Sequence, residues 1–110
     1  MRPQTAKELW TLFTEIFPSF SAYCEEEEIE PQTTLHFVMM DFTSYFGRYD
    51  ETFSESQLKK VGHFINDAIA VDDNLENAVS TCFLEHLRQI RSYKILAPFL
   101  SRQAKDKTHA

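Results

Sequence analysis

The chain has 110 residues, of which 43% are apolar and 25% charged, and its formal net charge is −6. This length fits one domain with its own core, and the acidic balance disfavours a general nucleic-acid binder, because such proteins are normally basic. The two glycines, Gly47 and Gly62, lie too far apart for a glycine-rich phosphate loop. No sequence motif identifies a reaction, so function has to be inferred from charge, size and shape.

The N-terminal part of the chain predicts two helices that meet at a proline. Thr5 and Glu8 form a capping-box pattern, and apolar residues then recur at spacings of three and four. Pro18 should end or kink this helix, since proline disfavours helical backbone at the preceding residue. A second short helix is expected from Pro18 to about Glu28, and Pro31 is expected at the start of the next helix.

The middle of the chain carries the longest apolar stripe. Apolar and aromatic residues between Leu35 and Tyr49 fall on one helical face, and Gly47 is expected to stop that helix. Ser54 and Gln57 form a second capping box, which opens a further helix. Two helices are therefore expected between residues 35 and 70.

The last part of the chain predicts further helices and then a tail. Gly62 is expected to allow a close helix contact, and residues 72–75 should end one helix and cap the next. Pro98 should break the final helical segment, and residues 105–110 are expected to form a polar, disordered tail. The sequence thus predicts an all-α fold, a single compact bundle-like domain of four to six helices over residues 1–104.

The sequence carries no recognisable export or membrane signal. The N-terminus is polar, and the longest apolar run, residues 37–40, is far below the roughly 20 residues of a membrane span. Cys24 and Cys82 lack a CxxC partner and are expected to remain thiols. We therefore expect a soluble cytoplasmic protein without membrane partners.

Charge is divided along the chain. Residues 1–87 hold 16 acidic and 5 basic side chains, a net of −11, and residues 88–110 hold 6 basic and 1 acidic, a net of +5. The longest acidic run is Glu25–Glu28 with Glu30. This run is either a solvated helix end or a surface for a basic partner. Acidic residues at the negative end of a helix dipole are unfavourable, which weakens the first interpretation.

Side-chain pairs at helical spacing offer little chemistry. Cys82 and His86 are spaced i, i+4, as in a metal pair or a thiol with a base, but their row is otherwise apolar. A buried cysteine beside an edge histidine is the preferred interpretation, and a metal-binding or enzymatic role stays an alternative. His63 and Asp67 are expected to form a surface pair. We therefore predict no enzyme activity, metal or cofactor.

Two stretches, Thr34–Gly47 and Glu76–Leu87, resemble an uncharacterised family of small bacterial helical proteins. In size and acidity the chain is also similar to the immunity proteins of bacterial toxin–immunity pairs. That resemblance implies neutralisation of a cognate toxin by tight binding, either by plugging its active site or by blocking its substrate surface. It carries no catalytic motif and assigns no functional residue.

The preferred hypothesis is an immunity or inhibitor protein that binds a toxin with a basic cleft through an acidic surface. A self-associating regulatory or adaptor module, hence a homo-oligomer, is the alternative. Nucleic acid is not an expected partner. The predicted partner-binding residues combine the acidic run, two nearby tyrosines and a second acidic pair: Tyr23, Glu25, Glu26, Glu27, Glu28, Glu30, Tyr49, Asp50 and Glu51.

Overall fold

The computed structural model describes residues 2–90 and 92–108, and all regular secondary structure in this part is helical. The four longer helices come first: α1 (Ala6–Ile16), α2 (Pro18–Glu26), α3 (Leu35–Tyr49) and α4 (Glu55–Ala68). The short turn η1 (Asp50–Thr52) joins α3 to α4. The shorter elements follow: α5 (Asn74–Val79), η2 (Ser80–Leu84), α6 (Glu85–Leu87), α7 (Ser92–Leu96), η3 (Ala97–Phe99) and α8 (Arg102–Asp106). The predicted all-α single domain is confirmed, with more helical segments than the four to six expected.

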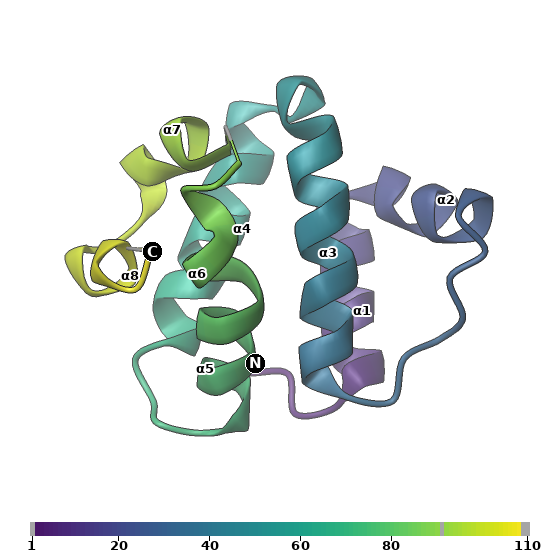
Figure 1. Ribbon diagram of the computed structural model, residues 1–110, viewed down its shortest axis with the longest axis horizontal. Helices are drawn as coiled ribbons and strands as arrows, with labels where there is room; N and C mark the ends of the chain where they lie inside the picture. Colours follow the sequence, from purple (N-terminus) through teal and green to yellow (C-terminus); the bar gives the residue numbers. More distant parts are fainter. Residues whose placement is uncertain (1, 91, 109–110) are drawn as a thin grey trace.

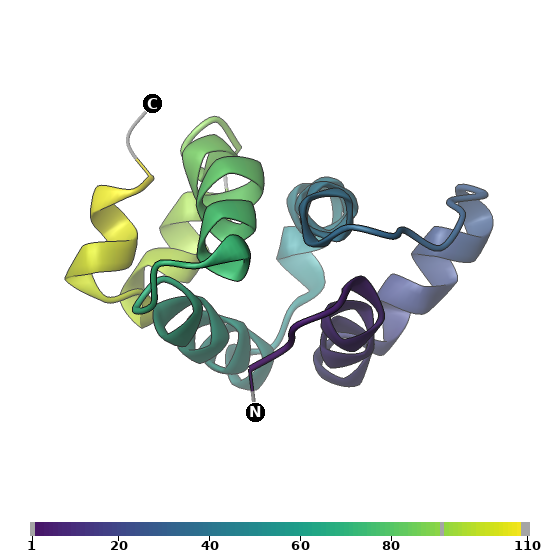
Figure 2. The ribbon, with the colours of Figure 1, turned by 90° about the horizontal axis from the view of Figure 1, so that it is seen from below.

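The helices form two layers with a flanking element on each side. Seen from below, α1 and α4 make one layer, and α3 with the α5–α6 segment makes the other (Figure 2). Helix α2 extends from one side of this core, and α7 and α8 cover the opposite side (Figure 1). The acidic run that begins in α2 and the basic C-terminal part of the chain therefore lie on opposite flanks.

Aromatic rings fill the space between the layers. Phe42 is fully buried on α3, and its ring stacks on Phe13 of α1 with centroids 3.8 Å apart. Phe20 of α2 and Phe83 of η2 meet the same ring at 5.7 and 5.8 Å. The abundance of phenylalanine is thus explained by core packing around α3.

The predicted helix starts are confirmed at three N-termini. Thr5 and Ser54 each cap a helix and complete a capping box with the residue three positions on. Asp73 caps α5 by accepting from the Glu76 backbone N–H. Gln57 also donates from Nε2 to the carbonyl oxygen of Ile16 at 3.0 Å, so the start of α4 is tied to the end of α1.

Two predicted helix boundaries are wrong. Gly47 does not stop α3, which continues to Tyr49 while the Ile90 side chain packs over the glycine. Pro31 does not begin a helix either, because Thr34 caps α3 through the Phe37 N–H. The tendency of glycine to end a helix does not prevail at Gly47, where Ile90 packs over α3. The tendency of proline to begin a helix does not prevail at Pro31, because Thr34 supplies the cap.

The C-terminal segment is ordered farther than expected. Ser101 caps α8, and Ala104 and Thr108 are fully buried. The Thr108 hydroxyl accepts a hydrogen bond from Arg88 Nε at 2.8 Å. The structure therefore differs from the expected disordered tail at residues 105–108, and residues 109–110 lie outside the described part.

The helical segment that begins with α5 is interrupted by a wide turn. η2 is π-helical, a form in which hydrogen bonds run from i to i+5. The hydroxyl of Thr43, on α3, lies 2.6 Å from the carbonyl oxygen of Cys82 and 2.7 Å from that of Met39. A neighbouring helix thus supplies a donor to the backbone of the wide turn.

Candidate functional site

The acidic edge, defined as Glu25–Glu28 with Glu30, lies at the C-terminal end of α2 and the start of the loop to α3. Ile29 N–H donates to Cys24 O at 2.9 Å and Glu28 N–H to Glu25 O at 3.2 Å. This is the Schellman pattern that ends many helices, and the acids do sit at the negative end of the α2 dipole.

Glu28 occupies a backbone position that usually belongs to glycine. Its φ is 54°, in the left-handed region, where a residue with a Cβ is strained by about 1–2 kcal/mol. Glycine would relieve that strain at this helix end. The chain instead carries a fourth consecutive carboxylate there.

One cation meets the acidic edge from α3. Arg48 Nη1 pairs with Glu27 Oε1 at 3.0 Å, and its guanidinium lies near the rings of Tyr23 and Tyr49, at 6.0 and 5.8 Å from their centroids. The carboxylates of the other acidic-edge residues make no ion pair or side-chain hydrogen bond within the described residues. The edge therefore keeps a net negative charge.

The predicted tyrosines are brought to the edge, but they are already packed. Tyr23 is only 7% exposed, and its ring meets Tyr45 at 5.5 Å and Tyr49 at 5.9 Å. Tyr49 is half-buried. Both rings pack against neighbouring aromatic rings and leave little surface for a partner.

The second acidic pair does not join the acidic edge. Asp50 is 7% exposed and accepts a hydrogen bond from Ser92 Oγ at 3.0 Å, so it connects η1 to α7. Its predicted role on a contact surface is therefore wrong, because the carboxylate is enclosed by the fold. Glu51 is exposed on η1.

An apolar cavity of about 470 Å³ opens beside the acidic edge, and we call it the edge cavity. Glu25 and Glu30 contribute to its lining, as does the indole of Trp10, which is 37% exposed. The lining also includes Lys7, Cys24, Ile29, Val38 and Asp41. Acidic, aromatic and aliphatic groups thus surround one hollow between α1, α2 and α3.

Two titratable groups in the edge cavity are partly removed from water. Burial raises the pKa of the Asp41 carboxyl, and a hydrogen bond from Gln32 Nε2 at 3.0 Å opposes that shift. Burial also raises the pKa of the Cys24 thiol. A raised thiol pKa disfavours the reactive thiolate, so Cys24 acts as a small wall residue.

Sequence reasoning missed Trp10 and Asp41. Trp10 sits at the margin of the stripe formed by Leu9 and Phe13, a position where a large ring reaches the surface. Asp41 lies at the border of the aromatic stripe of α3 and is partly buried. A lone tryptophan and a lone carboxylate at the borders of apolar stripes were the available signals.

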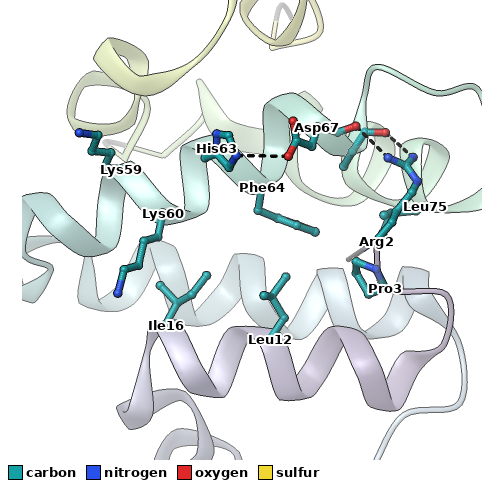
Figure 3. Close-up of a pocket in the computed structure, with 11 residues that line it drawn as sticks. Arg2, Pro3, Leu12, Ile16, Lys59, Lys60, His63, Phe64, Asp67 and Leu75 are labelled. Atoms are coloured by element: carbon teal, nitrogen blue, oxygen red, sulfur yellow. Dashed lines mark hydrogen bonds and ion pairs between the residues drawn. The ribbon is translucent and has the colours of Figure 1, made fainter.

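A second hollow, the α1–α4 groove, has a volume of about 730 Å³ (Figure 3). Leu12 and Ile16 of α1 face Phe64 of α4 across it, and all three side chains are partly exposed. Lys60 extends from α4 toward Ile16 at one end, and Arg2 lies at the other (Figure 3).

The Arg2 end of the groove is neutralised by the fold. Its guanidinium binds the Asp73 carboxylate at 2.8 and 3.0 Å and the carbonyl oxygens of Asp67 and Ala68 at 2.8 and 2.7 Å. The hydrogen bond from Arg2 is the main cause that lowers the pKa of Asp73. The segment before α1 is thus fastened to the end of α4 and the start of α5.

Asp73→Asn should remove a pH-dependent part of the stability while keeping the helix cap, since asparagine caps as well as aspartate. A carboxyl whose pKa is lowered by folding stabilises the fold above its ordinary pKa, and this contribution disappears as pH falls through the lower folded value. We expect the wild type to exceed Asp73→Asn in melting temperature at pH 7 and the difference to shrink below about pH 4.

Asp72→Asn is the matched control, since its exposed carboxylate makes no ion pair or hydrogen bond within the described residues. It should show no such pH-dependent difference. A difference for Asp73→Asn that stays constant between pH 7 and pH 3 would contradict the assigned role of the Arg2–Asp73 pair.

Two candidate side-chain pairs remain. One lies on the rim of the α1–α4 groove, and the other, Cys82 with His86, lines neither hollow. His63 Nε2 lies 3.4 Å from Asp67 Oδ2, so the two form the expected surface pair on the rim of the α1–α4 groove. Cys82 is half-buried in η2 and His86 is exposed. Over residues 2–90 and 92–108, no three His, Cys, Asp or Glu side chains are grouped so that they could hold a metal ion.

A family model described as a domain of unknown function, DUF7674, matches residues 10–107. The chain belongs to the DUF7674 family. The resemblance to an uncharacterised family is thereby confirmed. The DUF7674 match includes Trp10, the whole acidic edge and both walls of the α1–α4 groove, whereas Arg2 and Lys7 precede it.

No curated protein and no solved structure matches this DUF7674 chain. Among its described helices, none combines the length and the apolar character needed to cross a membrane. The function of this DUF7674 protein therefore has to be argued from its own surface.

Proposed function

We propose that this protein is an immunity or inhibitor protein that binds a basic toxin stoichiometrically, without catalysis, through the acidic edge and the edge cavity. The observation that carries the proposal is the juxtaposition of carboxylates that have no partner in the described structure with an apolar hollow walled by a partly exposed tryptophan. Tryptophan is enriched among the residues that dominate binding energy at protein interfaces.

A lysine or arginine side chain of the partner fits the edge cavity chemically. Its aliphatic stem would contact Ile29 and Val38, and its cation would lie over the Trp10 ring, an arrangement worth about 0.5–2 kcal/mol. Glu25 and Glu30 would neutralise the charge at the mouth. Among the described residues that line the cavity, Lys7 is the only basic one, and it reduces this attraction.

Asp41 favours a cation in the same place. Because burial raises its pKa, the ionised carboxylate is poorly stabilised in the free protein. A cation entering the edge cavity would offset part of that desolvation. The strained left-handed Glu28 is consistent with selection for charge at this helix end over local stability.

The choice of a toxin as partner rests on the resemblance to immunity proteins. A toxin that acts on nucleic acid presents a basic cleft to phosphate, and an acidic protein surface competes for that cleft. Electrostatic steering would also speed the association. The basic C-terminal flank lies on the opposite side of the molecule and would not oppose the approach (Figure 1).

Self-association is the second candidate function, and exposed apolar residues of α3 favour it. Phe37 and Met40 are 51% and 50% exposed and lie one turn apart on the outer face of α3. A second copy could cover this face. Sedimentation equilibrium of the wild type and of Phe37→Glu distinguishes this candidate, since only a dimer through this face is dissociated by the substitution.

The proposed function is tested by pairing the protein with the product of the neighbouring gene. If expression of that product arrests growth, co-expression of this protein should restore it. The double variant Glu25→Lys, Glu30→Lys should lower the association rate at low salt by at least about tenfold and lose protection, because both charges at the mouth of the edge cavity are reversed.

The double variant Asp72→Lys, Glu85→Lys is the matched control, because it also reverses two exposed acidic residues, both away from the acidic edge. It should retain protection and the wild-type association rate. Circular dichroism must show that both double variants are folded. Unchanged association of the folded Glu25→Lys, Glu30→Lys variant would overturn the assignment of this surface, and a neighbouring product that neither arrests growth nor binds would overturn the toxin partner.

A further inference from the structure

The α1–α4 groove is large and apolar enough to hold a small molecule. Its volume of about 730 Å³ falls in the range of ligand sites, roughly 300–1,000 Å³. Leu12, Ile16 and Phe64 line it and remain partly exposed although they face one another (Figure 3). The two helices therefore leave an apolar strip that the fold itself does not cover.

The charged side chains of the groove that make no ion pair within the described residues are lysines, and they lie at one end of the groove. Arg2 is fully engaged by Asp73 and two carbonyl oxygens, and His63 is paired with Asp67. Lys60 makes no hydrogen bond or ion pair within the described residues and extends across the groove toward Ile16 (Figure 3). Lys59, beside it on α4, adds a second cation to the rim.

We infer that the α1–α4 groove binds a medium-chain carboxylate, with its anionic head at Lys60 and its alkyl chain along Leu12 and Phe64 toward Pro3. The chemistry of the groove selects this class, because a single cationic end followed by an apolar strip complements a molecule with one anionic end and an apolar body. From Lys60 to Ala68 the strip follows two turns of α4, about 12 Å, which is a medium chain length rather than a long one.

Decanoate titrated into the isotope-labelled protein tests this site. Saturable binding is expected, with amide shifts concentrated at the groove-lining parts of α1 and α4. Octanoate should bind about tenfold more weakly, because two methylenes fewer are buried. Acetate, which has the head group without the chain, should not produce the same shifts.

Two further comparisons separate recognition of the carboxylate head group from nonspecific hydrophobic binding. Lys60→Met keeps an apolar stem and removes the charge, and it should weaken decanoate about fivefold while leaving decanol unchanged. Leu12→Glu should reduce decanoate binding more than about tenfold by placing a carboxylate in the strip. Its matched control is Thr11→Glu, the same charge change on an exposed position of α1 outside the groove, which should bind normally.

Three results would overturn the inference: no saturable decanoate binding, amide shifts elsewhere in the protein, or equal weakening of decanoate and decanol by Lys60→Met. Because the groove and the acidic edge do not share residues, the double variant Glu25→Lys, Glu30→Lys should still bind decanoate normally. Failure of this inference is thus distinguishable from failure of the proposed function.

Discussion

Phe42→Ala is expected to lower the free energy of unfolding by about 3–5 kcal/mol. The ring is fully buried and meets aromatic neighbours from α1, α2, α3 and η2, including Phe13 at 3.8 Å and Phe83 at 5.8 Å. Its removal leaves a cavity whose walls belong to several elements, so no single side chain can move in to fill it. Urea denaturation followed by circular dichroism measures the loss.

Phe37→Ala is the matched control, since it removes the same ring from the same helix. Phe37 is 51% exposed, and the substitution should change stability by no more than about 0.5 kcal/mol. Equal losses for the two variants would contradict the placement of the aromatic core around Phe42.

Gly62→Ala is expected to destabilise the fold by about 2 kcal/mol, although alanine is the better helix former. A Cβ at this position would lie 2.7 Å from the Cβ of Phe99 and 2.8 Å from its backbone oxygen. That oxygen accepts from Asn66 Nδ2 at 3.1 Å, and Asn66 Oδ1 accepts from the Ser101 N–H at 2.8 Å. The C-terminal end of η3 is therefore tied to Asn66 of α4 by two hydrogen bonds and cannot move away without losing them.

Gly47→Ala provides the comparison, because it makes the same substitution inside another helix. Its Cβ would meet the Ile90 Cδ1 at 3.2 Å, and this atom is the end of a rotatable side chain. The change should stay within about 1 kcal/mol of the wild type. Thermal unfolding of both variants measures the loss of stability. An equal loss for Gly47→Ala and Gly62→Ala would show that contact with the Phe99 backbone oxygen does not cause the destabilisation.

The features of the fold that follow from neighbouring residues could be predicted from the sequence. Capping at Thr5, Ser54 and Asp73 depends on side chains within three positions. The sequence identified Thr5 and Ser54 as caps and placed the third cap within residues 72–75. The close contact expected at Gly62 is confirmed, although its partner Phe99 could not be named. Local chemistry sets where these helices begin, and the apolar period sets which face is buried.

Features that depend on distant parts of the chain could not be predicted. Asp50 reads as one of a pair of surface acids, but it is buried by its bond to Ser92, 42 positions away. The edge cavity likewise needs Trp10, Glu30 and Asp41 to be brought together by three elements. The acidic run could be recognised in the sequence, whereas the cavity that lies beside it could not.

The wide turn at η2 has a consequence for the register of the helix that contains it. Leu75 and Val79 before the turn are buried, and Leu84 at its last position and Leu87 after it are fully buried as well. A π-helical turn holds one residue more than an α-helical turn, so deleting one residue there would rotate the following segment by about 100°. The additional residue in the π-helical turn changes the rotation of the helix about its axis. Apolar side chains on both sides of the turn therefore point into the same core.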